Sequence, residues 1–166
     1  MAIDFSIMYA AHDAFRRDLR KLTEEWDQGR WEQFKRQLLI HHQAEDELVW
    51  PLMRGRVAGD AAGVALIDEM EAEHAQIDPL LEAADVTTLR ALLDHHLQHE
   101  ETMALPLIDK ALDPAEWTAF SMALRDRQGG PPEWRAFFLW LLEDAPSQTK
   151  DNIRGVLPPE AHRLLD

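Results

Sequence analysis

The sequence has no cysteine among its 166 residues. This absence excludes disulfide bonds, zinc ribbons, cysteine-ligated iron–sulfur clusters and thiol catalysis. Positive charge is also scarce, because 17 lysines and arginines stand against 31 acidic residues, a formal net charge of −14. So acidic a surface repels nucleic acid phosphates and anionic lipids. We therefore expect neither nucleic acid nor a membrane as a partner.

Long hydrophobic runs are missing as well. No apolar segment reaches the roughly 20 residues that a transmembrane helix needs. The first 15 residues carry charges where a signal peptide would be continuously apolar. These features predict a cytoplasmic protein, and the chain length suits one folded unit with a substantial core.

Histidine, in contrast, occurs in a repeated pattern. Residues 41–53 and 95–108 are near-copies, each with a His-x-x-x-Glu pair and a proline six residues after the glutamate. The copies match His41 with His96, Glu45 with Glu100 and Pro51 with Pro106. Residues four apart lie on the same face of a helix. Each pair can therefore direct an imidazole nitrogen and a carboxylate at one metal ion.

Apolar periodicity predicts four long helices, each with one buried stripe. We expect them from about Asp4 to a stop at Gly29, from Trp31 to Met53, after an N-cap at Asp60, and after an N-cap at Asp85 or Thr87. The outer members of the stripes include Trp26, Leu48, Leu52, Met103 and Leu107. Pro51 and Pro106 are interpreted as structural residues that bend or end the second and fourth helices.

Six polar residues interrupt these apolar stripes: His12, His41, Glu45, His74, His96 and Glu100. A single histidine such as His12 is more simply a hydrogen-bonded core residue, but a buried carboxylate is costly unless it is paired or bound to metal. Imidazoles with carboxylates suit iron, manganese, cobalt or zinc. Two divalent ions would leave residual positive charge for a bridging oxide or hydroxide. They would also leave coordination positions for water, dioxygen, peroxide or nitric oxide.

Several polar residues lie beside the stripes. His42 and Asp46 are about 100° round the helix from His41, so we interpret them as flanking residues or hydrogen-bond partners of the ligands. His42 and His99 are also possible additional ligands. This placement predicts that His41→Ala loses far more metal than His42→Ala. Asp78 is open to three interpretations: a ligand, an acceptor for an imidazole N–H, or an exposed residue. Tyr9 could donate a hydrogen bond, ligate metal or pack, and His99 falls beside the fourth stripe.

Beyond residue 112 the sequence changes character. A capping box at 113–116 opens a fifth helix toward Gln128, and Gly-Gly-Pro-Pro at 129–132 ends it. Residues 134–142 are apolar on nearly every side, so they either cover an open end of the bundle, which we favour, or form a homodimer interface. We expect a four-helix bundle at 1–112 and an extension at 113–166 that packs on it as part of the same globular unit.

The repeat of one histidine followed by a His-x-x-x-Glu pair predicts an all-α, up-down-up-down four-helix bundle with additional C-terminal helices. Residues 3–112 resemble the hemerythrin-like (HHE cation-binding) domain, in its bacterial type with two His-x-x-x-Glu pairs. The resemblance rests on the six stripe residues and the two prolines. It implies an oxo- or hydroxo-bridged di-iron centre with Glu45 and Glu100 as bridges and the four histidines as terminal ligands.

The same resemblance frames the expected function. Oxygen-carrying members have a second histidine on the third helix where this chain has Asp78, which favours oxidation or peroxide chemistry over clean release of dioxygen. The first hypothesis is a protein that binds or senses dioxygen, nitric oxide or iron. The second is a di-iron enzyme that decomposes hydrogen peroxide or reduces nitric oxide. The third is metal storage or buffering.

Overall fold

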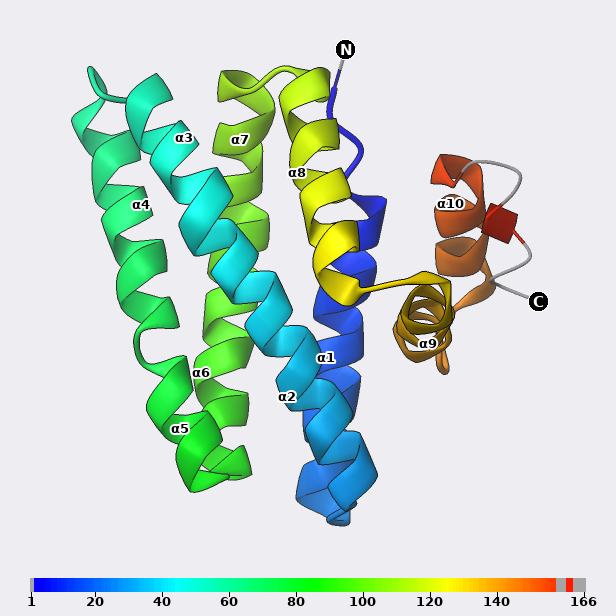
Figure 1. The fold of residues 1–166 in the computed structure, drawn as a ribbon. Helices are drawn as coiled ribbons and strands as arrows, with labels where there is room; N and C mark the ends of the chain where they lie inside the picture. The colour runs from blue at the N-terminus through cyan, green and yellow to red at the C-terminus, as the bar shows by residue number, and fades with distance from the viewer. Residues whose placement is uncertain (1, 158–160, 163–166) are drawn as a thin grey trace.

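A computed structural model describes residues 2–157 and 161–162, and this part of the chain is helical without a strand (Figure 1). In chain order the helices are α1 (Ser6–Glu24), α2 (Gln28–Ala44), η1 (Glu45–Val49), α3 (Trp50–Arg56), α4 (Ala61–His74), α5 (Ile77–Ala83), α6 (Val86–His99), η2 (Glu100–Ala104), α7 (Leu105–Ala111), α8 (Pro114–Gln128), α9 (Pro131–Leu141) and α10 (Ser147–Val156). Four long helical stretches run alternately down and up, namely α1, α2–η1–α3, α4–α5 and α6–η2–α7. The predicted all-α bundle with additional C-terminal helices is confirmed.

Aspartates begin three of the four long helical stretches. The side chains of Asp27, Asp60 and Asp85 each accept a hydrogen bond from a backbone N–H in the following turn. Asp85, rather than Thr87, is therefore the cap of α6. The predicted stop at Gly29 is wrong, because Asp27 already caps α2 and Gly29 lies in its first turn. Helix α1 ends at Glu24, so Trp26 falls outside it and is 49% exposed.

The second and fourth long stretches each contain a five-residue π-helical segment, η1 or η2, which begins at the glutamate of the His-x-x-x-Glu pair. The N–H groups of Trp50 and Leu105 bond to the carbonyls of Glu45 and Glu100, five residues earlier. Proline follows at once in both cases, and it has no N–H for the helical ladder. The wider turn accommodates the proline, so the two helices continue to Arg56 and Ala111 instead of ending near it.

Each π segment contains one extra residue per turn and so shifts the buried face by one position. Leu48, Leu52 and Met103, which simple periodicity places inward, are 37%, 36% and 54% exposed. Leu107 is half-buried. The residues that are buried in their place are Val49, Trp50 and Met53 in one copy and Ala104, Leu105 and Ile108 in the other. The predicted stripes are therefore wrong beyond the glutamates.

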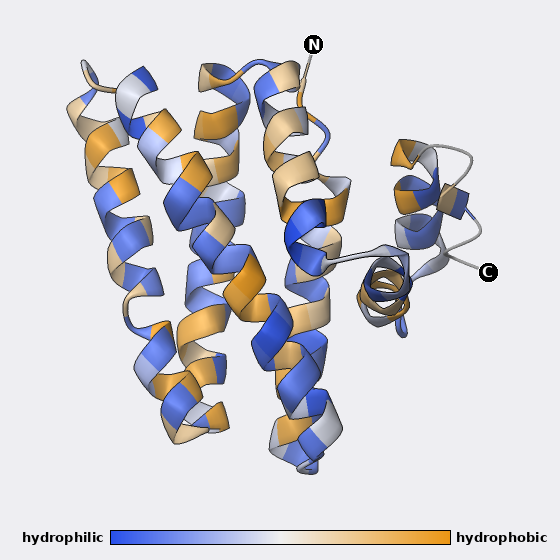
Figure 2. Ribbon diagram, in the orientation of Figure 1, coloured by the Kyte–Doolittle hydropathy of each residue, from blue (hydrophilic) through white to orange (hydrophobic). Residues whose placement is uncertain are grey.

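Two apolar clusters fill the bundle, and each bundle helix carries both hydrophobic and hydrophilic residues along its length (Figure 2). On α1, Met8 belongs to one cluster and Phe15 to the other, with His12 between them. The same order holds along α4 and α5, where His74 at the end of α4 separates Met70 from Ile77, the first residue of α5. The polar stripe residues therefore occupy a middle layer that is closed by apolar side chains on both sides.

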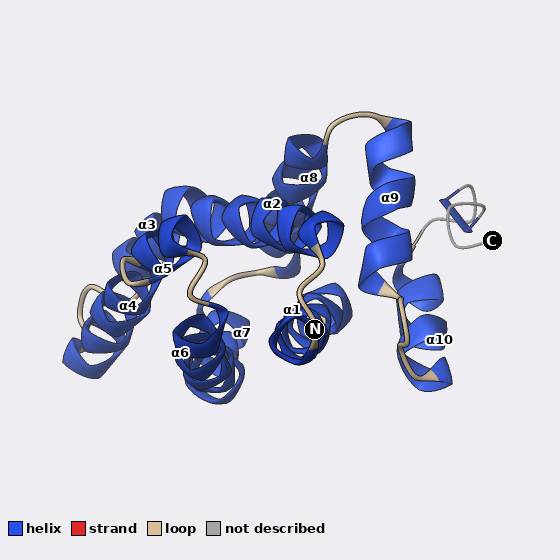
Figure 3. Ribbon diagram, turned by 90° about the horizontal axis from the view of Figure 1, so that it is seen from below, coloured by secondary structure: helices blue, strands red, loops and turns tan. Residues whose placement is uncertain are grey.

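The C-terminal helices pack along the side of the bundle, with α8 against α2, and α9 and α10 against α1 (Figure 3). Trp140, Leu141 and Ile153 join the apolar cluster of the bundle. Residues 134–142 thus cover a flank of α1. The prediction that they cover an open end of the bundle is wrong. Leu139 stays 53% exposed, and a homodimer through this segment stays a prediction. None of the described helices is long and apolar enough to cross a membrane.

A buried polar network attaches the extension to α1. Asp18 is fully buried and accepts hydrogen bonds from Trp140 Nε1 at 2.7 Å and from Arg30 at 2.6 Å. Arg17 donates to the backbone carbonyls of Trp140 and Glu143, at 2.8 Å each. Hydrogen bonds from Arg30 are the main cause that lowers the pKa of Glu143 to about 2. Nothing in the sequence pattern indicates that Arg17 and Asp18 are buried.

Candidate metal centre

The middle layer of the bundle brings together all six polar stripe residues. Their exposures are 0% for His12, 4% for His41, 0% for Glu45, 5% for His74, 0% for His96 and 0% for Glu100. They come from the four long helical stretches, so the site exists only when the whole bundle has folded. Two carboxylates in such a layer carry a large desolvation penalty unless positive charge lies between them.

Each glutamate lies close to imidazole nitrogens from its own helix and from a neighbour. Glu45 lies 3.1 Å from His41 Nε2 and 3.6 Å from His74 Nε2. Glu100 lies 3.3 Å from His12 Nε2 and 4.0 Å from His96 Nε2. Both His-x-x-x-Glu pairs therefore point inward, and each carboxylate lies between two histidines.

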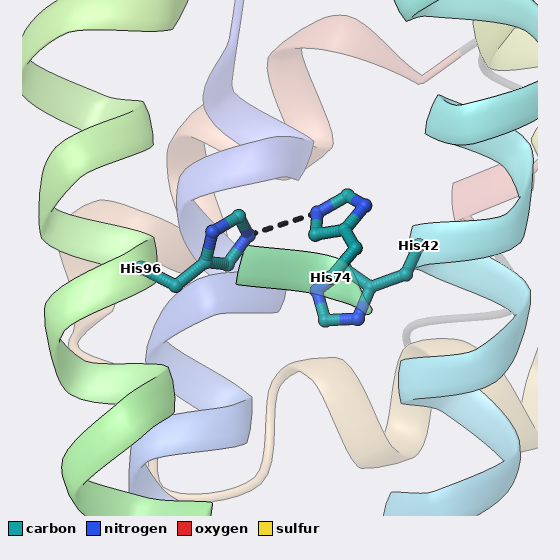
Figure 4. A group of neighbouring side chains, drawn as sticks. All are labelled: His42, His74 and His96. Atoms are coloured by element: carbon teal, nitrogen blue, oxygen red, sulfur yellow. Dashed lines mark hydrogen bonds between the residues drawn. The ribbon is translucent and has the colours of Figure 1, made fainter. Parts of the chain in front are cut away.

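His42 also belongs to this layer, contrary to the flanking position that we predicted for it. The residue is 6% exposed, and its ring lies 4.2 Å from that of His74 and 5.3 Å from that of His96, centroid to centroid. Figure 4 shows the three side chains converging from three helices. A bundle helix buries an arc wider than one seam, so His41 can face α1 while its neighbour in sequence faces α4.

Carboxylates outside the layer orient three of the histidines. The Nδ1 atom of His12 lies 2.9 Å from Glu101, that of His74 lies 2.7 Å from Asp46, and that of His96 lies 2.7 Å from Glu73. A carboxylate accepts a hydrogen bond, so in each case Nδ1 carries the proton. Nε2 therefore keeps a lone pair that is directed inward. A hydrogen bond from the outer nitrogen to a carboxylate is the usual support of metal-binding histidines.

Sequence reasoning anticipated only Asp46 among these acceptors. Glu101 follows a stripe glutamate directly and is held by two hydrogen bonds from Arg16, of 2.8 and 3.0 Å. Glu73 precedes His74 and accepts hydrogen bonds from His96 and His99. Burial raises the pKa of Glu73, but these histidines outweigh burial and lower it to about 2. The sequence feature that could have identified Glu101 and Glu73 is that each is adjacent to a stripe residue.

The Nε2 atoms of His74 and His96 lie 3.0 Å apart (Figure 4). With both Nδ1 atoms donating to carboxylates, two neutral rings would place lone pairs against each other. Seven further nitrogen and oxygen atoms of the layer are buried without a hydrogen-bond partner: Nε2 of His12, His41 and His42, and both carboxylate oxygens of Glu45 and of Glu100. Buried polar atoms normally find partners. Inward lone pairs and carboxylate oxygens are the donor set that a metal ion requires.

Burial and the close approach of charged groups shift the pKa values of several residues in this layer. Burial, and then the charge of Glu100, raise the pKa of Glu45 well above its usual value. Burial also raises the pKa of Glu100, but His12 and its neighbours outweigh this and lower it to about 2. The pKa of His12 is lowered by burial and raised by Glu100 and Glu101, to about 8. Burial is the main cause that lowers the pKa of His41 to about 3.

Three other candidates lie away from this layer. Asp78 is exposed in the first turn of α5, because α4 ends at His74 and the four-residue spacing between them is interrupted. Tyr9 is 44% exposed, and its role as a hydrogen-bond donor, a ligand or a packing residue stays a prediction. Burial, followed by the charges of Glu101 and Glu100, raises its pKa. His99 bonds through Nδ1 to Glu73 at 2.9 Å and faces outward from the centre.

Three groups within the middle layer could each hold a metal ion: His42 with His74 and His96, His12 with His41 and Glu100, and His41 with His42 and Glu45. The chain matches the model of the hemerythrin HHE cation binding domain over residues 4–108. No curated protein and no solved structure matches it significantly. The matched segment covers the four helical stretches that supply all seven residues. The chain therefore belongs to the hemerythrin HHE cation-binding domain family.

Proposed function

We propose that this chain is a non-haem di-iron protein that binds or senses dioxygen or nitric oxide. The observation that carries the proposal is the layer of buried imidazole and carboxylate atoms that lack hydrogen-bond partners. His12 and His41 would hold one ion, and His42, His74 and His96 the other. Glu45 and Glu100, which lie between the histidines, would contact both. Iron bound there would supply a redox-active Lewis acid with exchangeable positions.

His42 changes the balance between the functional hypotheses. Oxygen-carrying relatives have a histidine where this chain has Asp78, and that difference argued for a centre poor in nitrogen ligands. The ring of His42 lies beside His74 and can supply the nitrogen from a neighbouring helix. Five imidazoles with two carboxylates then form a donor set suited to holding a small molecule reversibly. The nitrogen-rich donor set therefore favours binding over the oxidation chemistry that the sequence suggested.

An apolar cavity favours gases as the ligands. It has a volume of about 870 Å³, lies between the bundle and the C-terminal helices, and includes His41 in its lining. Most of the lining is aromatic or aliphatic, with Phe15, Ile40, Trp117 and Phe138 among its residues. Dioxygen and nitric oxide enter such a space easily, whereas hydrogen peroxide would lose hydrogen bonds to water. The cavity therefore provides an approach to the centre for apolar diatomic molecules.

The residues of the chain have distinct tasks in this proposal. Glu101, Asp46 and Glu73 hold protons on the outer nitrogens of three histidines, which keeps their inner nitrogens available. Phe15 packs edge-on against His41, with ring centroids 5.3 Å apart, and helps to exclude water from the layer.

Metal content and ligand spectra test the proposal directly. Protein produced in iron-replete medium should contain about two iron ions per chain and show a near-ultraviolet charge-transfer band. After anaerobic reduction, dioxygen and nitric oxide should each give a spectral change that reverses on gas removal. Irreversible bleaching, gas evolution or consumption of peroxide would support the di-iron enzyme instead. Zinc alone, or no metal, would reject the di-iron assignment.

Ile40→Trp tests the cavity as the approach route. Ile40 is half-buried, lines the cavity and precedes His41, so an indole there should narrow the path without removing a ligand. We expect gas binding in stopped-flow experiments to slow several-fold at unchanged iron content. Leu139→Trp is the control, because Leu139 is exposed on α9 and does not line the cavity. Equal rates in the two variants would contradict a route through this cavity.

A further inference from the structure

A second group of metal-ligating side chains lies outside the buried centre, where α4 and α6 pack together. His95 and His99 are one turn apart on α6, with ring centroids 5.8 Å apart. Glu69 and Glu73 are one turn apart on α4. Two such pairs on neighbouring helices present four ligands to one region, because residues four apart share a helix face.

The four side chains already converge. His99 Nδ1 lies 2.9 Å from Glu73 Oε1, and His99 Nε2 lies 3.6 Å from Glu69. His95 Nε2 lies 3.5 Å from the same Glu73 oxygen. One ligand atom from each of Glu73, His95 and His99 falls within 4.8 Å of the others, a spacing that one ion can span. The side chain of His95 is 70% exposed, so turning it toward an ion disturbs no packing.

The chemistry of the group selects the kind of ion. Two neutral imidazoles and two carboxylates balance the charge of a divalent cation. Imidazole nitrogen favours zinc, nickel, cobalt or ferrous iron over magnesium and calcium, which prefer oxygen alone. Tetrahedral zinc sites are commonly built from histidine and carboxylate ligands. The acidic surface, with a formal charge of −14, also raises the local concentration of cations.

Glu73 links this group to the buried centre. Its Oε1 atom faces His95 and His99, while its Oε2 atom accepts the hydrogen bond from His96 Nδ1 at 2.7 Å. An ion bound to Oε1 would withdraw negative charge from the carboxylate and so make His96 a weaker donor toward the centre. Loss of such an outer partner weakens metal binding by about 10–100-fold.

We propose that Glu69, Glu73, His95 and His99 form an outer site for one divalent first-row ion, such as Zn²⁺, which is coupled to the buried centre through Glu73. The site itself does not depend on the proposed function, but the coupling rests on it. Because linkage is reciprocal, an ion in either place changes the affinity of the other.

Calorimetric titration of Zn²⁺ tests the outer site by itself. In a Glu45→Leu background, which weakens the centre, the additional His95→Ala or His99→Ala change should lower the amount of bound Zn²⁺ by one ion per chain. Glu71→Gln and His162→Ala are controls. Glu71 lies on α4, as Glu69 and Glu73 do, but pairs with Arg54 of α3, and His162 lies elsewhere. Zinc binding that is the same with and without His95 and His99 would overturn the site, whatever the centre contains.

Coupling is tested in the iron-loaded protein. Adding one equivalent of Zn²⁺ should shift the charge-transfer band of the centre and speed the release of iron to a chelator. Both effects should vanish in His95→Ala, which leaves every residue of the middle layer in place. Zinc that binds but leaves the spectrum and the release rate unchanged would overturn the coupling, while the titration above would still establish the site.

Discussion

Glu45→Leu should abolish metal loading and at the same time stabilise the metal-free protein. Glu45 is fully buried, and neither of its carboxylate oxygens has a hydrogen-bond partner. Without metal it is therefore a buried polar group in a layer enclosed by apolar side chains. Leaving a buried polar group without a hydrogen-bond partner costs about 1–3 kcal/mol, so an apolar residue of similar size should recover a stabilisation of that order. Loss of a ligand should weaken metal binding by more than about 100-fold, since loss of an outer partner alone costs about 10–100-fold.

Two measurements on the same variant separate these effects. Urea unfolding of chelator-treated protein gives the stability, and elemental analysis after reloading with iron gives the metal content. Glu82→Leu is the matched control, because Glu82 is an exposed glutamate on α5 and should change neither quantity. A metal-free Glu45→Leu protein that is less stable than the parent would show that Glu45 has a structural partner that the geometry does not reveal.

The second large effect is expected at His42. His42→Ala should lose metal to about the same extent as His41→Ala, because both rings lie in the middle layer and both Nε2 atoms lack partners. The helical-wheel prediction was the opposite. Removing an imidazole ligand should lower affinity by at least about 10–100-fold, the range known for outer partners.

Metal content after dialysis against a graded series of chelator concentrations distinguishes the two predictions. His162→Ala is the control, because the His162 ring bonds to the backbone carbonyls of Arg154 and Leu157, away from both groups of metal-ligating side chains. Circular dichroism should show that each variant keeps its helical content. Added imidazole should restore part of the iron spectrum in His42→Ala if the ring is a ligand. Full metal content in His42→Ala, with a large loss in His41→Ala, would show that His42 is a flanking residue and not a ligand.

Much of the candidate centre could be read from spacing alone. Within a regular helix, residues at steps of three and four share a face, so His12, His41, His74 and His96 could be assigned to buried stripes. The pairing of Glu45 with His41 follows from the same rule. These predictions succeeded because they concern residues that lie before any interruption of their helix.

The predictions failed where a helix departs from regularity or meets more than one neighbour. Leu48 and Met103 face outward because a π turn between the glutamate and the proline adds one residue. A proline shows that a helical bond is missing, but it does not show whether the helix ends, bends or widens. Asp78 is exposed, which is one of the three interpretations left open for it, because the helix is interrupted between α4 and α5. The apolar pattern alone does not choose among the three.

The sequence by itself determined the helical class, the number of long helices and the six polar residues of their stripes, because these depend on local periodicity. Only the tertiary structure decided that His42 belongs to the same layer, since α4 packs against the side of α2 that the stripe leaves open. It also decided which carboxylates hold the outer nitrogens of His12, His74 and His96. Those contacts join residues between 23 and 89 positions apart in the chain. The packing of helices, which no local pattern contains, brings them together.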